Sequence, residues 1–332
     1  MPAVHAAAET LRLSVAPMID WTDTFCRAFH RVVAPHARVY TEMLHANAVL
    51  HGDRERLLGF DASQHPVALQ LGGSDPALLA QAARIGEAHG YDEINLNCGC
   101  PSDRVQAGKF GACLMREPDL VADCVAAMIG AVQIPVTMKC RLGVDDDHAY
   151  EKFRAFVDVV AATGCTRFVV HARNAWLQGL SPKENREIPP LRHGWAYRLK
   201  AERPQLDIVL NGGIASIEAV REHLAKLDGV MLGRAAYHTP YLLHELDVAL
   251  FGGRLRTREQ LLRAYLPYVE RKLGEGVALK NISKHVLGLY HGQPGGRLFR
   301  QILSEGAHKP NAGIELVERA IAATKDALAS AA

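Results

Sequence analysis

The chain has 332 residues, of which 48% are hydrophobic and 22% charged, and its formal net charge at pH 7 is +2. This is an ordinary globular composition that can bury a large core, and the near-neutral charge neither indicates nor excludes a polyanionic partner. Residues 245–332 hold 13 Lys and Arg against 9 Asp and Glu, so this last part is mildly basic, as a nucleic-acid-binding region would be.

The seven cysteines form no CxxC pair, and their odd number does not suit a complete disulfide framework. The segment Met1–Thr10 lacks the basic and apolar regions of a signal peptide. The most apolar stretch, Cys124–Val132, is far shorter than the ~20 residues that span a bilayer. We therefore expect a reducing, cytoplasmic environment and no membrane association.

Short apolar runs rich in β-branched residues recur along the chain, and most precede a segment with helical spacing. The predicted strands are Leu13–Met18, Arg38–Met43, Val67–Leu71, Glu93–Asn97, Val136–Arg141, Arg167–His171, Asp207–Asn211 and Gly229–Leu232. Helices are predicted at Pro76–His89, Asp119–Ala131, Tyr150–Thr163 and Ile217–Leu227. Such alternation indicates a parallel sheet, and eight units predict an α/β fold of the (β/α)₈ TIM-barrel type. A doubly wound sheet is disfavoured because no GxGxxG follows the first strand.

Beyond about residue 245 the β-branched runs stop. Helices are predicted at Leu261–Leu273, Lys280–Tyr290, Leu298–Ala307 and Ile314–Ala329. We therefore expect a barrel domain at residues 1–244 and an all-helical domain at 245–332. A long insertion, Ala172–Arg198, follows the sixth strand, and insertions of this length are often functional.

Polar or reactive residues stand at the carboxyl ends of the predicted strands, where barrel enzymes build their active sites. They are Met18, Glu42, Gln70, Asn97, Lys139, His171, Asn211 and Gly233. This clustering predicts an enzyme.

Two glycine turns follow the seventh and eighth strands. They are Asn211-Gly212-Gly213 and Gly233-Arg234. Glycine lets backbone N–H groups approach an anion that an arginine neutralises, so the turns favour phosphate binding over ordinary tight turns. Flavoenzymes, aldolases and isomerases all use such a site, so the cofactor stays open at this point.

Lys139 ends the fifth strand and is predicted to point into an apolar barrel mouth, where it needs an anion. It suits a flavin, whose reduced ring carries negative charge, or a Schiff-base aldolase. His171 is read as a hydrogen-bond donor, because few carboxylates stand at neighbouring strand ends to complete a metal site.

The segment Asn97-Cys98-Gly99-Cys100-Pro101 puts a thiol on a loop just past a strand, between a glycine and a proline. Such a thiol can be an acid, a nucleophile or a metal ligand. The Cys-x-Cys spacing is not that of zinc sites, so no metal is expected.

With these motifs in hand, the chain resembles the tRNA-dihydrouridine synthase family. The resemblance covers nearly the whole barrel in order, from Ala16-Pro17-Met18 through Asn95–Ser102, Gly111–Met115, Lys139-Cys140-Arg141 and His171-Ala172-Arg173 to the two glycine turns. Ser181–Pro190 and His308-Lys309 resemble one bacterial branch, which acts on tRNA uridines 20 and 20a. The family usually has valine or methionine where this chain has Cys98, a second thiol that could compete with Cys100.

The resemblance implies FMN in the barrel mouth, NADPH or NADH as reductant, and a helical domain that helps to hold the tRNA D-loop. It implies that Cys100 donates a proton to the uracil. The implied FMN-binding residues are Pro17, Met18, Ile19, Gln70, Lys139, His171, Asn211, Gly212, Gly213, Gly233 and Arg234. The implied tRNA-binding residues are Asn97, Lys183, Arg186, Arg297 and Arg300.

Three alternatives remain. A dihydroorotate dehydrogenase-like FMN barrel would explain the turns and Lys139, but not the helical tail. A phosphate-binding aldolase would need no flavin. A non-catalytic tRNA-binding protein would need neither Cys100 nor Lys139.

Overall fold

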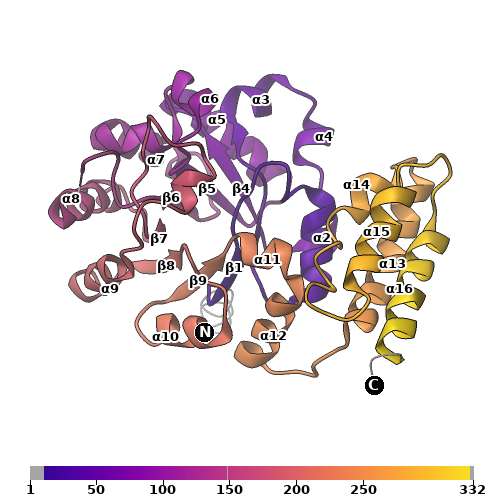
Figure 1. Ribbon diagram of the computed structural model, residues 1–332. Coiled ribbons are helices and arrows are strands. Elements are labelled where there is room, and N and C mark those ends of the chain that lie inside the picture. The colour runs from indigo at the N-terminus through magenta and orange to yellow at the C-terminus, as the bar shows by residue number, and fades with distance from the viewer. Residues whose placement is uncertain (1–10, 148, 330–332) are drawn as a thin grey trace.

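A closed parallel barrel forms the larger part of the protein (Figure 1). The computed structural model describes residues 11–147 and 149–329, with the backbone alone at residues 104 and 326–329. The strands are β1 (Leu13–Val15), β2 (Val39–Tyr40), β3 (Leu44–His45), β4 (Val67–Gly72), β5 (Glu93–Cys98), β6 (Val136–Cys140), β7 (Arg167–His171), β8 (Asp207–Asn211) and β9 (Gly229–Leu232). Their order is β1-β9-β8-β7-β6-β5-β4-β2, with β3 also paired to β4. The N–H of Val15 donates to the carbonyl of Arg38 at 2.9 Å and closes the circle, which confirms the predicted (β/α)₈ barrel.

Helices surround the strands as an outer layer (Figure 1). They are α2 (Thr24–Val33), α3 (Ala46–His51), α4 (Arg54–Leu58), α5 (Pro76–Ala88), α6 (Asp103–Ala107), α7 (Pro118–Ile129), α8 (Tyr150–Ala161), α9 (His193–Glu202), α10 (Ile217–Leu224), α11 (Arg234–His238) and α12 (Pro240–Phe251). Side-chain caps define several starts: Asp75 caps α5 ahead of Pro76, and Ser216 caps α10.

The strand alternation divides the barrel residues into two sets. Outward side chains join the helices in one large apolar core, whereas a smaller cluster that includes Ala68, Val169, Val209 and Met231 forms separately. Beside it, the fully buried carboxylate of Glu93 is paired with two arginines and bonded to two hydroxyls: Arg38 at 3.2 Å, Arg167 at 3.1 Å, Tyr40 at 2.8 Å and Thr137 at 2.7 Å. Because every charge here has a partner, the buried carboxylate is neutralised within the fold.

Two predicted strands are shorter in the structure than the apolar runs suggested. The first ends at Val15, because Pro17 has no N–H to donate and the chain then turns. The second is split into β2 and β3, because the hydroxyl of Thr41 accepts from the N–H of Gln70 at 3.0 Å in place of a backbone carbonyl. The insertion after β7 is also shorter than predicted, since α9 begins at His193.

Four further helices lie side by side beyond α12, next to α2 (Figure 1). They are α13 (Arg258–Gly274), α14 (Leu279–Ser283), α15 (Gly296–Gly306) and α16 (Ile314–Ala329). Thr257 and Gln260 form a reciprocal capping box that starts α13. The division into two domains stays a prediction, and its expected boundary at residues 244–245 falls inside α12.

The helix predicted at Lys280–Tyr290 is wrong beyond Ser283, where the chain continues in turns up to α15. Gly288 lies so close to α11 that a Cβ there would be 2.5 Å from the carbonyl oxygen of His238. The turns therefore follow from backbone packing against the barrel, which helical periodicity cannot register.

No helix among the described residues is both long and apolar enough to cross a membrane. The expectation that Met1–Thr10 is no signal peptide concerns residues outside those described.

Candidate active site

A chain of buried amides crosses the barrel mouth. Gln70 donates to Asn95 at 2.8 Å, and Asn95 donates to the hydroxyl of Thr137 at 2.8 Å. Asn97 donates to the side-chain oxygen of Gln70, also at 2.8 Å. Because each amide is fixed by its neighbour, Asn95 and Thr137, deeper in the barrel, hold the side chains of Gln70 and Asn97 in place. Asn95 is a site residue that the sequence alone did not single out as one.

Asn97 also holds the loop that carries Cys100, which we call the cysteine loop. Its side-chain oxygen accepts from the N–H groups of Gly99 and Cys100, both at 3.0 Å. The half-buried thiol of Cys100 lies 3.5 Å from the hydroxyl of Ser102. Asn97 therefore determines where Cys100 stands.

Cys98 ends β5 and is fully buried in the large apolar core. Burial raises the pKa of its thiol well above the ordinary value. The expected competition with Cys100 therefore does not hold in this structure, because Cys98 is closed to solvent and to reagents.

Lys139 extends from β6 to a single amide: its Nζ donates to the side-chain oxygen of Asn211 at 3.1 Å, and Asn211 in turn donates to the carbonyl of Met231 at 2.8 Å. Burial, and then the charge of Arg141, lower the pKa of Lys139 to about 8. Among the described residues no carboxylate lies within 4.0 Å of this ammonium. The mouth thus has a cation that can accept an anionic partner.

His171, at the end of β7, is largely buried. Burial first, and then the charges of Arg141 and Lys139, lower its pKa well below the ordinary value. The ring is therefore neutral at physiological pH and can donate a hydrogen bond without adding a charge.

Only the first of the two glycine turns is shaped for close approach, because Gly233 in the second has φ of −101° and a Cβ there would meet only Ala16, 3.9 Å away. Gly212 and Gly213 have φ of +111° and +74°, and a Cβ on Gly212 would lie 2.7 Å from the His171 ring. After the second turn, Arg234 pairs with Glu187 of the long loop at 2.5 Å. That pair is exposed to solvent, so its net contribution to the stability of the fold is small.

Pro17, Met18 and Ile19 form the turn after β1. The carbonyl of Met18 accepts from Trp21 at 3.1 Å and from Thr22 at 2.9 Å, and Ile19 is 54% exposed. An exposed isoleucine on a tightly bonded turn offers an apolar surface to a ligand.

The long loop after β7 is anchored from inside. Asn185 is fully buried, accepts from the N–H of Trp176 at 2.7 Å and donates to its carbonyl at 2.9 Å. Arg141, buried behind the mouth, donates to the carbonyls of Asn174 and Asn185 at 3.0 and 2.8 Å. Lys183 and Arg186 are exposed on this loop. The sequence showed Asn185 and Arg141 only as parts of motifs, because their role depends on contacts across the loop.

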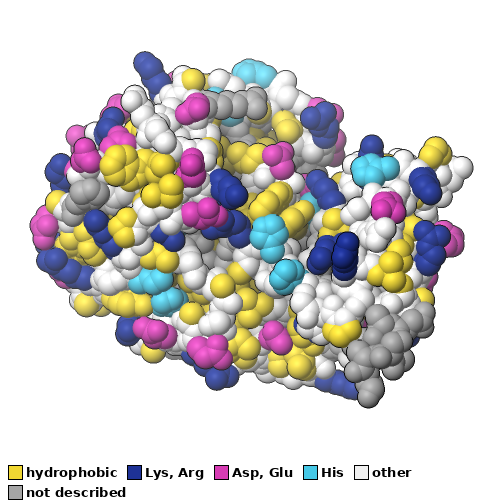
Figure 2. Space-filling model, viewed as in Figure 1, with side chains coloured by type: hydrophobic (Ala, Val, Ile, Leu, Met, Phe, Trp, Pro, Cys, Tyr) yellow, Lys and Arg dark blue, Asp and Glu magenta, His cyan; other side chains and the backbone are white. Residues whose placement is uncertain are grey.

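Arg297 and Arg300 lie near the start of α15, Arg297 exposed and Arg300 half-buried. Neither makes an ion pair with another residue in the described ranges. Figure 2 shows charges of both signs interspersed over this face rather than one basic field. Affinity for a polyanion would therefore depend on such local clusters. No group of three or more His, Cys, Asp or Glu among the described residues is arranged to hold a metal ion.

Residues 14–326 match the model of the family described as "Dihydrouridine synthase (Dus)". The chain belongs to the dihydrouridine synthase family. It is similar to proteins named "tRNA-dihydrouridine(20/20a) synthase" from Xanthomonas campestris (69% identity over 98% of this chain and 97% of the relative), Xylella fastidiosa (65%; 95% and 93%) and Vibrio cholerae (54%; 94% and 96%).

A solved structure of 2-naphthoyl-CoA reductase bound to 2-naphthoyl-CoA superimposes with a TM-score of 0.55 at 12% identity. The superposition covers 72% of this chain and 50% of the reductase chain. At this identity the likeness concerns the barrel fold alone. Family membership favours the dihydrouridine synthase reading over the aldolase, the dihydroorotate dehydrogenase-like enzyme and the non-catalytic tRNA-binding protein.

Proposed function

We propose that this chain reduces uridine to 5,6-dihydrouridine at positions 20 and 20a in the D-loop of tRNA, in the cytoplasm, with FMN as cofactor and NADPH as reductant. The observation that carries the proposal is the thiol of Cys100, held by Asn97 in the mouth of a barrel whose chain matches this family over residues 14–326. The named positions are those of the similar proteins.

FMN fits the residues present. The glycines of the Gly212-Gly213 turn carry no side chain, so backbone can approach a phosphate there, and Arg234 stands after the second turn. Lys139 lacks a carboxylate partner among the described residues and would gain an anionic one. The residues that would hold the cofactor are Pro17, Met18, Ile19, Gln70, Lys139, His171, Asn211, Gly212, Gly213, Gly233 and Arg234.

The reaction adds a hydride at C6 and a proton at C5 of uracil. When bound, FMN supplies the hydride. The thiol of Cys100 gives its proton to C5, and the resulting thiolate regains one from water. Lys139, with a pKa of about 8, is largely protonated at neutral pH and stabilises negative charge in the mouth, while neutral His171 donates a hydrogen bond.

The tRNA is held on two sides of the mouth in this proposal. Lys183 and Arg186 on the long loop and Arg297 and Arg300 on α15 contact phosphates, which offsets the few kcal/mol needed to unstack the target base. Asn97, expected at the uracil edge, has its oxygen engaged with the cysteine loop, so we assign it the placing of Cys100 as well.

Two measurements test the proposal. tRNA from cells that lack this protein should lose dihydrouridine at positions 20 and 20a, and the wild-type gene should restore it. Loss at other positions, or none, would overturn the assigned substrate. The purified protein should release FMN on denaturation, and release of FAD instead would overturn the cofactor.

A further inference from the structure

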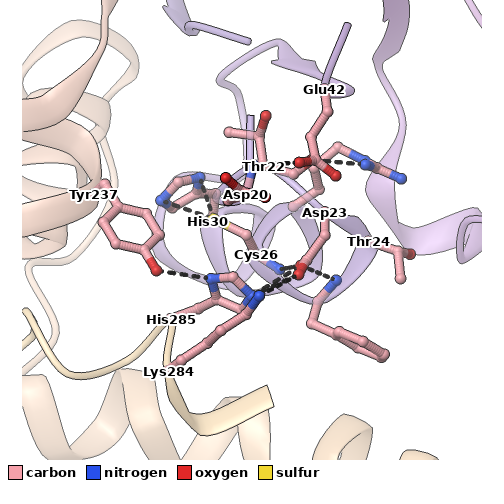
Figure 3. A network of polar contacts seen from close by, with 12 residues as sticks. Asp20, Thr22, Asp23, Thr24, Cys26, His30, Glu42, Tyr237, Lys284 and His285 are labelled. Atoms are coloured by element: carbon pink, nitrogen blue, oxygen red, sulfur yellow. Dashed lines mark hydrogen bonds and ion pairs between the residues drawn. The ribbon is translucent and has the colours of Figure 1, made fainter. Parts of the chain in front are cut away.

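One histidine of the helical tail joins two elements of the barrel (Figure 3). Nε2 of His285, which follows α14, lies 2.9 Å from the carboxylate of Asp23, the N-cap of α2. Its Nδ1 lies 3.2 Å from the hydroxyl of Tyr237 on α11. The imidazole is 1% exposed, so both contacts lie inside the protein.

The partners fix the state of the ring. A carboxylate only accepts hydrogen bonds, so Nε2 carries a proton and donates to Asp23, and Nδ1 accepts from the Tyr237 hydroxyl. Burial lowers the pKa of His285, which keeps the ring neutral and Nδ1 free to accept. Lys284 pairs its ammonium with Asp23 at 3.0 Å.

Tyr237, held by His285, in turn contacts the turn after β1. Its ring stacks on Trp21 with centroids 4.4 Å apart and planes 14° from parallel. The N–H of Trp21 donates to the carbonyl of Met18, and the N–H of Met18 donates to the Thr22 hydroxyl at 2.9 Å. Tyr237 is also one helical turn beyond Arg234. The ring of His285 is therefore tied both to the Met18 turn and to the helix that carries Arg234.

We propose that His285 is a positioning residue of the cofactor site. Held between Asp23 and Tyr237, it sets the spacing between the Pro17–Trp21 turn and α11, the two segments that carry residues which would hold FMN. The inference rests on the proposed function, and it gives the helical tail a part in cofactor binding in addition to tRNA binding.

Other contacts at α2 allow the positioning role of His285 to be distinguished from a contribution to stability alone. Asp23 caps α2 through bonds to the N–H groups of Phe25 and Cys26, both at 3.0 Å, and these do not need His285. Tyr265 of α13 donates to the carbonyl of Phe25 at 2.9 Å. This bond joins the tail to α2 without touching the Met18 turn, so Tyr265→Phe is a matched control.

The test is the dissociation constant of FMN, measured on flavin-free protein by quenching of flavin fluorescence. Removal of a buried hydrogen-bonded partner should weaken FMN binding by roughly 10-fold in His285→Ala. Tyr237→Phe keeps the ring stack and removes only the hydroxyl, so it should weaken binding less, about 3-fold. The double variant should be no weaker than His285→Ala, because both changes break one chain of contacts.

Tyr265→Phe should lower the melting temperature and leave FMN affinity unchanged. Unchanged FMN affinity in His285→Ala and Tyr237→Phe, or an equal loss in Tyr265→Phe, overturns the positioning role while the proposed function stands. If His285→Ala does not fold, Tyr237→Phe alone decides between the two outcomes. A wild-type protein that binds no FMN overturns both proposals.

Discussion

The two neighbouring cysteines at the mouth differ in a way that decides their chemistry. Cys100 is half-buried on a loop held by Asn97, whereas Cys98 is fully buried and points into the core. A proton donor must reach its substrate, so only the first thiol qualifies.

We expect Cys100→Ala to retain FMN and NADPH oxidation but to lower dihydrouridine formation by ~10²-fold or more, the usual scale for removal of a positioned acid. Cys98→Val, which supplies an apolar side chain to the same core site, should leave both activities intact. Single-turnover reduction of tRNA by each variant measures this. A harmless Cys100→Ala with a damaging Cys98→Val would reverse the assignment.

His30, a buried residue of α2, provides a prediction about pH. Burial, and then the nearby His285, lower its pKa to about 3, from about 6.5 in the unfolded chain. As the pH falls below 6.5 the unfolded state takes up this proton first, so the stability present above pH 6.5 declines toward pH 3.

Relative to His30→Gln, the wild type should lose roughly 1.4 kcal/mol of unfolding free energy per pH unit between pH 6 and 4. Urea denaturation at several pH values measures the difference. Exposed His51 serves as the control, and His51→Gln should follow the wild-type curve. Parallel curves of unfolding free energy against pH for wild type and His30→Gln would show that His30 does not cause the loss of stability at low pH.

At the scale of elements, the long loop after β7 depends on one buried amide. Asn185 bonds to both backbone groups of Trp176 and to the carbonyl of Leu180 at 3.1 Å. Asn185→Ala leaves these buried groups without partners, at a cost of ~1–3 kcal/mol each.

In the Asn185→Ala variant, protease should therefore cut the loop faster between residues 172 and 192. The affinity for tRNA should fall by about 10-fold, because Lys183 and Arg186 are no longer held in fixed positions. FMN should stay bound. Asn281→Ala, at an exposed position of α14, is the control. An unaltered cleavage pattern would mean that other contacts hold the loop.

The α15 arginines give the second element-scale prediction. Arg297 and Arg300 are three residues apart on one helix and share a face. Replacing both by alanine should weaken tRNA binding and reduce the slope of log affinity against log salt, by roughly one unit for each phosphate that the variant no longer binds.

The matched control for α15 is the double replacement of Lys280 and Arg319, exposed cations of α14 and α16. NADPH-driven flavin reduction should be unchanged in both double variants. Equal slopes for wild type and the Arg297/Arg300 variant would place the docking surface elsewhere.

At the scale of the whole molecule, the barrel and the helical tail meet through charged and polar contacts as well as apolar packing. Arg271 of α13 pairs with Asp61 at 2.5 Å, and Arg256 donates to the carbonyl of Val32 at 2.5 Å. Arg256 and His285 reach α2, Arg271 reaches Asp61, and His285 also contacts Tyr237 of α11, so tail and barrel are joined through several elements. The proposed binding of tRNA on the tail and of FMN in the mouth would therefore take place on connected parts of one structure.

The sequence by itself determined the barrel, the glycine turns and the set of reactive residues at the strand ends, because apolar periodicity and residue type report on local backbone and burial. Only the tertiary structure decided that Cys98 faces the core, that Asn97 holds Cys100, and that residues 284–290 are turns instead of helix. It also brought His285 to Asp23, 262 residues away along the chain. Such contacts depend on how distant elements pack against each other, and no local pattern in the chain encodes that packing.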